Sequence, residues 1–253
     1  MQGIRLVYLV VLLPFSAHAI VNVEEMRRAQ DKDGFSGRLD LSLSGDSGNT
    51  ETFSGSIGTR LQWKQGPVTD LFILNYDYGE SGNVTDANNG FAHLRHIVQV
   101  TVKRAYEAFT QIETDKFARL SFRGLIGGGV RYKVRQNDNN KIYIGLGAFH
   151  AWERLEEQEG LSEGGTDRFW RANVYLVYDY QFRDGVNAGS TTYYQPALES
   201  LSDARVLEEA ALKVKLGDDL DLKIALEIIH DTRPPETVKK TDVSYSSGIE
   251  YHF

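Results

Sequence analysis

Residues 241–253 read TDVSYSSGIEYHF, and residue character alternates along this stretch. From Val243 onward every second residue is mostly apolar or aromatic, while the residues between are polar or small, as at Ser244 and Glu250. A strand that crosses a membrane presents apolar side chains to lipid and polar ones to the lumen with a period of two. The stretch therefore predicts a membrane-crossing β-strand.

The same stretch ends on an aromatic residue, Phe253, two positions after Tyr251. A final strand of this kind resembles the last strand of bacterial outer-membrane β-barrels, where a terminal Phe is similar to the signal read by the barrel-assembly machinery. The resemblance implies that Tyr251 and Phe253 form an assembly signal and that this machinery is a partner.

Residues 1–19 have the pattern of a secretory signal peptide. A basic residue, Arg5, precedes an apolar run, and Ala17-His18-Ala19 supplies the small-x-small cleavage pattern. Pro14 interrupts the apolar run well short of the ~20 residues that a membrane helix needs. We expect cleavage after Ala19, which leaves the charged, non-alternating residues 20–34 as a periplasmic tail.

Composition sets limits on the function. The chain has 253 residues and no cysteine, which excludes disulfides, thiol chemistry and Cys-ligated metals. Its net charge of −7 argues against nucleic acid as a partner. A mean hydropathy of −0.37 is compatible with a membrane barrel, because only alternate strand residues must be apolar.

Period-two alternation begins at Phe35 and continues to Phe253. It predicts one domain over residues 35–253, an all-β, single-chain antiparallel transmembrane β-barrel. We expect about twelve strands, and an even number places both termini in the periplasm. The predicted strands cover 35–45, 51–64, 68–79, 91–102, 105–114, 120–134, 141–152, 168–182, 186–194, 205–216, 220–230 and 241–253.

The connections between these strands alternate in length, as outer-membrane barrels require of periplasmic turns and extracellular loops. The even-numbered connections are short, for example 65–67 and 217–219. The long polar segments fall on the odd-numbered ones, at 80–90, 153–167, 195–204 and 231–240, although two odd connections are short. Aromatic residues gather near strand ends, with Trp152 and Trp170 near the extracellular rim.

The polar face of each strand supplies the residues expected to line the lumen. Both signs of charge occur there, and buried charges must pair or remain hydrated. A closed, ion-paired interior and a narrow aqueous pore are both compatible with this pattern. The lumen-facing candidates are Arg38, Asp40, Arg60, Arg95, Glu107, Glu113, Arg123, Arg131, Lys133, Glu209, Lys213 and Glu227.

Several segments resemble one known family. They are Ile20 to Glu24, Ser42 to Thr50, Phe91 to His96, Glu107 to Gln111 and Phe117 to Arg123. Together they resemble the salt-induced outer-membrane protein family of Gram-negative bacteria, domain of unknown function 481. The resemblance spans nearly the whole mature chain and implies an outer-membrane β-barrel. It brings no substrate, cofactor or catalytic residue.

Motifs for catalysis or metal binding are weak. No His is followed two residues later by Ser, the spacing of outer-membrane phospholipase A. His230-Asp231 resembles the Asp and His pair of omptin proteases only as a lone dipeptide. His93 and His96, three apart on a strand, point to opposite faces and do not suit a shared metal. We expect no catalytic, cofactor or metal site; the acidic segment 153–167 is either a solvated surface or a divalent-cation contact to lipopolysaccharide.

The sequence thus favours a non-enzymatic barrel of the Gram-negative outer membrane, structural or stress-related, with a narrow or closed polar lumen and with lipids and lipopolysaccharide as neighbours. A small-solute diffusion channel is the first alternative. A lipid- or peptide-hydrolysing enzyme at the extracellular rim is the second. A soluble lipocalin-like barrel is disfavoured by the strand number and by Phe253.

Overall fold

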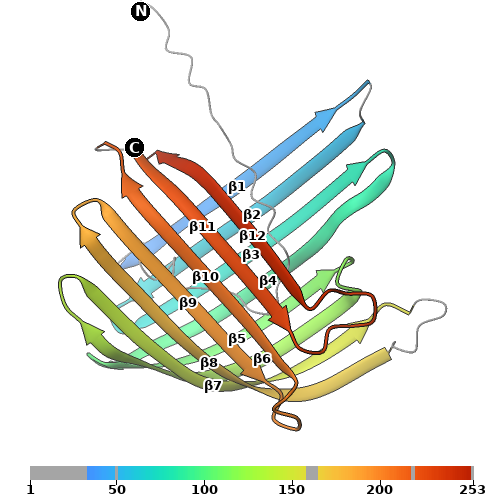
Figure 1. Ribbon diagram of the computed structural model, residues 1–253. Coiled ribbons are helices and arrows are strands. Elements are labelled where there is room, and N and C mark those ends of the chain that lie inside the picture. The colour runs from blue at the N-terminus through green and yellow to red at the C-terminus, as the bar shows by residue number, and fades with distance from the viewer. Residues whose placement is uncertain (1–32, 49–50, 158–164, 218–219, 252–253) are drawn as a thin grey trace, which may run out of the picture.

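The protein is described by a computed structural model for residues 33–48, 51–157, 165–217 and 220–251. These residues form one twelve-stranded antiparallel sheet in which each strand pairs with the next in the chain (Figure 1). The all-β antiparallel prediction is confirmed. The predicted signal peptide, nearly all of the predicted tail, and Phe253 lie outside the described residues.

Each strand overlaps one of the predicted segments. Their bounds are β1 Gly34–Asp46, β2 Thr52–Gln65, β3 Val68–Ser81, β4 Val84–Thr101, β5 Arg104–Asp115, β6 Leu120–Gln136, β7 Asn140–Leu155, β8 Gly165–Arg183, β9 Val186–Pro196, β10 Ala204–Lys215, β11 Leu220–Asp231 and β12 Thr241–Tyr251. None of the described residues belongs to a helix long and apolar enough to cross a membrane.

The predicted long loop at 80–90 is wrong. Strand β3 continues to Ser81 and β4 begins at Val84, so only Gly82 and Asn83 connect them. Both residues have positive φ angles, 56° and 63°, as a two-residue type I′ hairpin turn requires. Asn88 and Asn89 fall within the predicted loop but lie in β4, where they pair with Tyr78 and Asp77.

The predicted loop 153–167 is also too long. Strand β7 runs to Leu155 and β8 starts at Gly165, so Glu153 is a strand residue opposite Asp167. Its side chain is buried. Glu153 therefore does not belong to a solvated acidic loop, and this difference places it at the centre of the site described below.

The two faces of the sheet differ in chemistry. One face exposes large apolar side chains, such as Ile126 at 57% and Leu146 at 60%. The other face buries charged side chains, such as Arg95 at 4%. On this second face the Tyr175 hydroxyl of β8 donates to Glu107 of β5. Strands that are not neighbours can meet in this way only across a concave surface, so the charged face is the inner one.

Figure 1 shows a strongly curved sheet around a central space. In the described residues β1 and β12 are the two edges and are not hydrogen-bonded to each other. The sheet is therefore curled but not closed in this structure.

Aromatic and aliphatic side chains also occupy the concave face, between the charged ones. One cluster is formed by Tyr175, Val177, Tyr193 and Leu207 from β8, β9 and β10. Gly145 of β7 lies opposite Tyr175 of β8, and a Cβ at position 145 would overlap the tyrosine ring. The glycine thus makes room for the ring to lie across the sheet, which fixes the tyrosine hydroxyl near Glu107.

Candidate functional site

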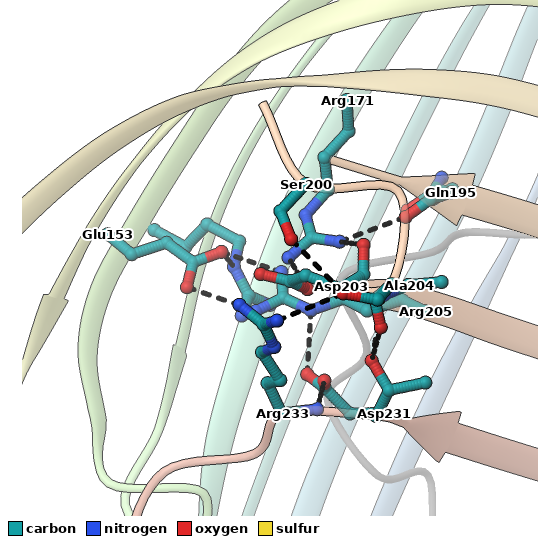
Figure 2. A network of polar contacts seen from close by, with 12 residues as sticks. Glu153, Arg171, Gln195, Ser200, Asp203, Ala204, Arg205, Asp231 and Arg233 are labelled. Carbon is teal, nitrogen blue, oxygen red and sulfur yellow. Dashed lines mark hydrogen bonds and ion pairs between the residues drawn. The ribbon is translucent and has the colours of Figure 1, made fainter. Parts of the chain in front are cut away.

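A polar network occupies the concave face at the ends of β6, β7, β10 and β11, and Figure 2 shows its centre. Glu153 accepts hydrogen bonds from Arg123 Nε at 2.6 Å and from Arg205 Nη1 at 2.6 Å. Arg205 also donates from Nε to Asp231 at 2.8 Å. The network consists of charge-assisted bonds among nearly buried groups, which are stronger than neutral hydrogen bonds.

The Glu153–Arg205 contact joins β7 to β10, two strands that are separated in the sheet by β8 and β9. Neither side chain could reach the other along the sheet surface, so the contact spans the concave space. This ion pair is a brace across the interior and narrows it at the end that carries the long connections.

A second part of the network ties the β9–β10 connection to the sheet. Arg171 of β8 donates to the Asp203 carboxylate at 2.7 Å and to the Gln195 carbonyl at 2.9 Å. The Phe169 ring lies 4.9 Å from the Arg171 guanidinium carbon and 5.9 Å from that of Arg205, within cation–π distance of both. The arginines are held by carboxylates on one side and by an aromatic face on the other.

Deeper in the sheet lies a second group of charges, on β4 and β5. Arg95 and Glu107 form an ion pair with an Nη1 to Oε2 distance of 2.9 Å, and both side chains are about 3% exposed. The Arg95 guanidinium also lies 4.9 Å from the Phe109 ring centre. Glu107 has both carboxylate oxygens occupied, because Tyr175 donates to the other one at 3.2 Å.

The two groups are joined into one chain of contacts, because Arg95 Nε donates to His93 Nε2 at 3.3 Å. His93 bonds to Gln111 at 3.0 Å, and Gln111 in turn donates to Glu113. Glu113 pairs with Arg123, which also binds Glu153 in the first network. The contacts therefore continue from His93 on β4 to Asp231 on β11, and the carboxylates along it are engaged by donors.

Arg119 makes separate hydrogen bonds at the same end of the sheet as the network. Its guanidinium donates to the Glu236 carbonyl at 3.0 Å and to the Glu156 carbonyl at 3.1 Å. Glu236 lies in the β11–β12 connection, while Arg119 lies in the β5–β6 turn. The same β11–β12 connection is held to the β9–β10 connection, since Arg233 Nη2 donates to Ser202 Oγ at 3.0 Å. These contacts tie the connections to one another at this end of the sheet.

The structure places the predicted lumen residues on the concave face wherever it describes their side chains. Arg95, Glu107, Glu113 and Arg131 are buried, and Arg123 is nearly so. The side chains of Arg38 and Asp40 lie outside the described part of the chain. The other predicted residues are partly exposed, and they are Arg60, Lys133, Glu209, Lys213 and Glu227.

The pairing differs in part from the expected one. Arg123 meets Glu113, as the pattern of opposite charges suggests, but its second partner is Glu153. Arg131 packs its guanidinium 4.0 Å from the Tyr143 ring centre. Tyr251, half of the predicted assembly signal, is the last residue of β12, and its side chain lies outside the described part of the chain.

A family model described as "Protein of unknown function, DUF481" matches residues 39–253. The chain belongs to this family. No curated protein gives a significant match. Among solved structures, one titled "NanC porin structure in rhombohedral crystal form." aligns with 85% of this chain and 100% of that chain, at 8% identity and a TM-score of 0.49.

The DUF481 match covers every residue of the network. Glu153, Asp203, Arg205 and Asp231 belong to the network but are not among the predicted lumen-facing residues. A signal for Glu153 was present, because Phe149, Ala151 and Glu153 continue the inward alternation of β7. Asp203 carries no such signal, since it lies in a connection whose path the alternation does not determine.

The histidine motifs are separated by the sheet. His230 donates to or accepts from Thr241 Oγ1 at 2.8 Å on the outer face, whereas Asp231 pairs with Arg205 inside. His93 is buried inside and His96 lies outside beside Asp70 at 2.6 Å. Within the described residues, no group of three or more His, Asp or Glu side chains could hold a metal ion.

Proposed function

We propose that this protein is a non-enzymatic β-barrel of the Gram-negative outer membrane whose polar lumen is constricted by the ion-paired network. The observation that carries the proposal is the inverted character of the two faces. Large apolar side chains such as Ile126, Leu146 and Tyr245 are exposed on the convex face, while arginine and glutamate are buried on the concave face. A soluble protein rarely exposes so extensive an apolar surface, whereas a barrel in lipid requires it.

Closure of the sheet is part of the proposal. An open sheet edge leaves backbone N–H and C=O groups without hydrogen-bond partners. In the hydrocarbon core of a bilayer each such group costs several kcal/mol. Strands β1 and β12 both continue the outward apolar pattern, with Leu41 and Val243 exposed. In a bilayer these two edges pair and complete a twelve-stranded barrel.

The orientation follows from the connections. The three longest connections follow β7, β9 and β11, all odd-numbered strands, although the connection after β3 is as short as those after β2, β4 and β8. Long loops of such barrels face outward from the cell. The network and the Arg119 contacts then lie at the extracellular mouth, and both termini lie in the periplasm.

Single cysteines test insertion and orientation, because the chain has no cysteine of its own. On intact cells, a membrane-impermeant maleimide should label a cysteine at Leu201 in the β9–β10 connection. It should label one at Gly66 only after the outer membrane is permeabilised. A cysteine at Ile126 should resist labelling in the membrane and react after denaturation. Fast labelling of the Ile126 variant in intact membranes would reject the inserted barrel.

Conductance in planar bilayers tests the constriction. The wild-type protein should show little or no steady conductance. The double variant Arg119→Ser/Arg205→Ser removes the contact to Glu236 and the brace to Glu153, and it should open or enlarge a path. A large stable conductance of the wild-type protein would contradict the constricted lumen and favour a diffusion channel.

A diffusion channel is the second candidate, and one observation favours it. The inner face of β1, β2 and β12 carries mostly small side chains at the described positions, including Ser42, Ser56, Ser244 and Ser246. Such a surface leaves room for water beside the charged side of the interior. A wild-type conductance blocked by bulky substitutions at Ser56 or Ser246 would support this alternative.

A further inference from the structure

The outer face of β7 and β8 carries a group of cationic and aromatic residues at its extracellular end. The group, called here the rim site, consists of Trp152, Arg154, Arg168 and Trp170. Trp152 lies directly opposite Arg168 in the β7–β8 register. Arg154 lies opposite Thr166 and is therefore a diagonal neighbour of Arg168. On β7, Trp152 and Arg154 lie an even number of residues from the exposed Leu146 and so share its face of the sheet. On β8, Arg168 lies opposite Trp152, and Trp170 is two residues further along, so both lie on that face as well.

The aromatic part of the rim site is held in place by its neighbours. His150 lies between the two indoles, with ring centres 6.1 Å from Trp152 and 5.1 Å from Trp170. Gly124 of β6 lies beneath Trp152, and a Cβ there would overlap the indole ring. The indole therefore packs on Gly124, in a position that a larger residue at 124 would not permit.

The two arginines are exposed, unlike the paired arginines of the interior. Arg154 is oriented by Ser121, whose hydroxyl lies 3.4 Å from Arg154 Nε and donates to the Arg154 carbonyl at 2.8 Å. Among the described residues, neither Arg154 nor Arg168 has a carboxylate partner. Two guanidinium groups on adjacent strands thus face the level at which the lipid headgroups begin.

Other strands do not repeat this arrangement. The outward side chains at the corresponding ends of β1, β2, β3, β5, β9 and β10 are Leu43, Phe53, Tyr78, Thr114, Tyr194 and Val206. Among the strand ends compared, outward cationic side chains thus occur on β7 and β8, beside two of the three tryptophans of the chain, while Arg233, Lys239 and Lys240 lie in the β11–β12 connection rather than on a strand. Such a distribution differs from a uniform girdle and indicates recognition at one place.

We infer that the rim site binds a phosphorylated glycolipid of the outer leaflet, the lipid A part of lipopolysaccharide, through its phosphate groups. Guanidinium groups bind phosphate through paired N–H donors, and indole rings pack at the boundary of headgroups and acyl chains. Two adjacent positive charges match a phosphomonoester, which carries up to two negative charges, better than the phosphodiester of a zwitterionic phospholipid. The inference rests on the proposed outer-membrane insertion and orientation.

Binding of purified, folded protein in detergent micelles to defined lipids tests the inference. The probes are bis-phosphorylated lipid A, dephosphorylated lipid A and phosphatidylethanolamine. The wild-type protein should bind bis-phosphorylated lipid A at least tenfold more tightly than either of the others. Arg154→Ser/Arg168→Ser should lose at least tenfold in affinity for it and lose the preference for the phosphorylated form.

A matched control removes the same charge from the other end of the β6–β7 hairpin. Arg135→Ser/Lys141→Ser alters two exposed cationic residues beside the short β6–β7 turn and should change lipid A affinity less than twofold. Circular dichroism and heat-modifiable migration on gels establish that each variant is folded. Equal binding of the three lipids by the wild type, or an equal loss in both double variants, would overturn the rim site.

The two proposals fail in different measurements. Cysteine labelling and fractionation decide whether the protein is inserted in the outer membrane in the proposed orientation. The micelle experiment decides whether Arg154 and Arg168 recognise phosphate. A protein that inserts but does not distinguish the lipids refutes only the rim site.

Discussion

The inner face of the sheet has two contrasting regions. The charged wall, on β4 to β10, carries Arg95, Glu107, Glu153 and Arg205 together with aromatic rings. The small-residue wall, on β1, β2 and β12, carries mainly serine and glycine at the described inward positions, and in this region the only buried side chain that the structure describes is Gln62. The long side chains of the charged wall contact one another across the concave space.

The difference also concerns the stability of the sheet. Side chains of the charged wall contact strands three places away, as in the Tyr175–Glu107 and Arg205–Glu153 pairs. The small-residue wall includes both sheet edges, β1 and β12, and it is held mainly by backbone ladders to β2 and β11. Regions with few buried contacts open at lower free energy than densely packed ones. The seam of the proposed barrel therefore lies in its less constrained half.

The largest expected effect of a single substitution is in the charged wall. Glu153→Ala leaves two nearly buried arginines, Arg123 and Arg205, without their shared carboxylate. Breaking a buried pair by removing one partner costs about 3–5 kcal/mol. Urea unfolding in lipid vesicles should show this loss. The control Glu157→Ala changes an exposed residue just beyond β7 and should stay within about 0.5 kcal/mol of wild type. Similar midpoints for both variants would contradict the bracing role of Glu153.

A smaller effect is expected where the charged wall is packed on glycine. Gly145→Ala places a methyl group in the space of the Tyr175 ring and should cost about 1–3 kcal/mol, the usual range for overpacking. The control is Gly55→Ala on β2, where the nearest side-chain atom would be Leu43 Cδ1 at 3.5 Å, an ordinary contact. It should be neutral or slightly stabilising by up to about 1 kcal/mol, because alanine loses less conformational entropy in a strand. A larger loss at Gly55 than at Gly145 would reverse the comparison.

The sequence predicted the strands well because alternation is a local property. Each observed strand overlaps a predicted one, and the errors occur where polar residues continue a strand. The predicted loops 80–90 and 153–167 include Asn88, Asn89 and Glu153, which instead pair within β4 and β7. The true β3–β4 turn, Gly82-Asn83, has the composition of a two-residue hairpin and could have been identified from it.

The site was less predictable because its partners come from distant strands. Alternation places Arg123 and Glu113 on the inner face, but it does not indicate that β7 and β10 approach each other across the interior. That approach depends on the curvature of the sheet and on the side-chain volumes of the opposite wall. Asp231 illustrates the limit: beside His230 in sequence, it faces away from this residue and binds Arg205.

The smallest expected effect on stability is for a substitution in the small-residue wall. The same substitution tests how accessible this wall is to water compared with the charged wall. Ser246→Cys replaces a partly exposed residue of β12 on the concave face, and the free energy of unfolding of this variant should remain within about 0.5 kcal/mol of wild type. Thr191→Cys is its counterpart on β9, where the side chain is only 2% exposed. In folded protein in micelles, a small water-soluble thiol reagent should modify the cysteine at position 246 at least tenfold faster than the one at 191. This difference follows from water beside the serines and packed side chains around Thr191, and no other cysteine is present to interfere. Equal rates would mean that the two regions of the interior are filled alike, and the comparison on which the narrow lumen is based would fail.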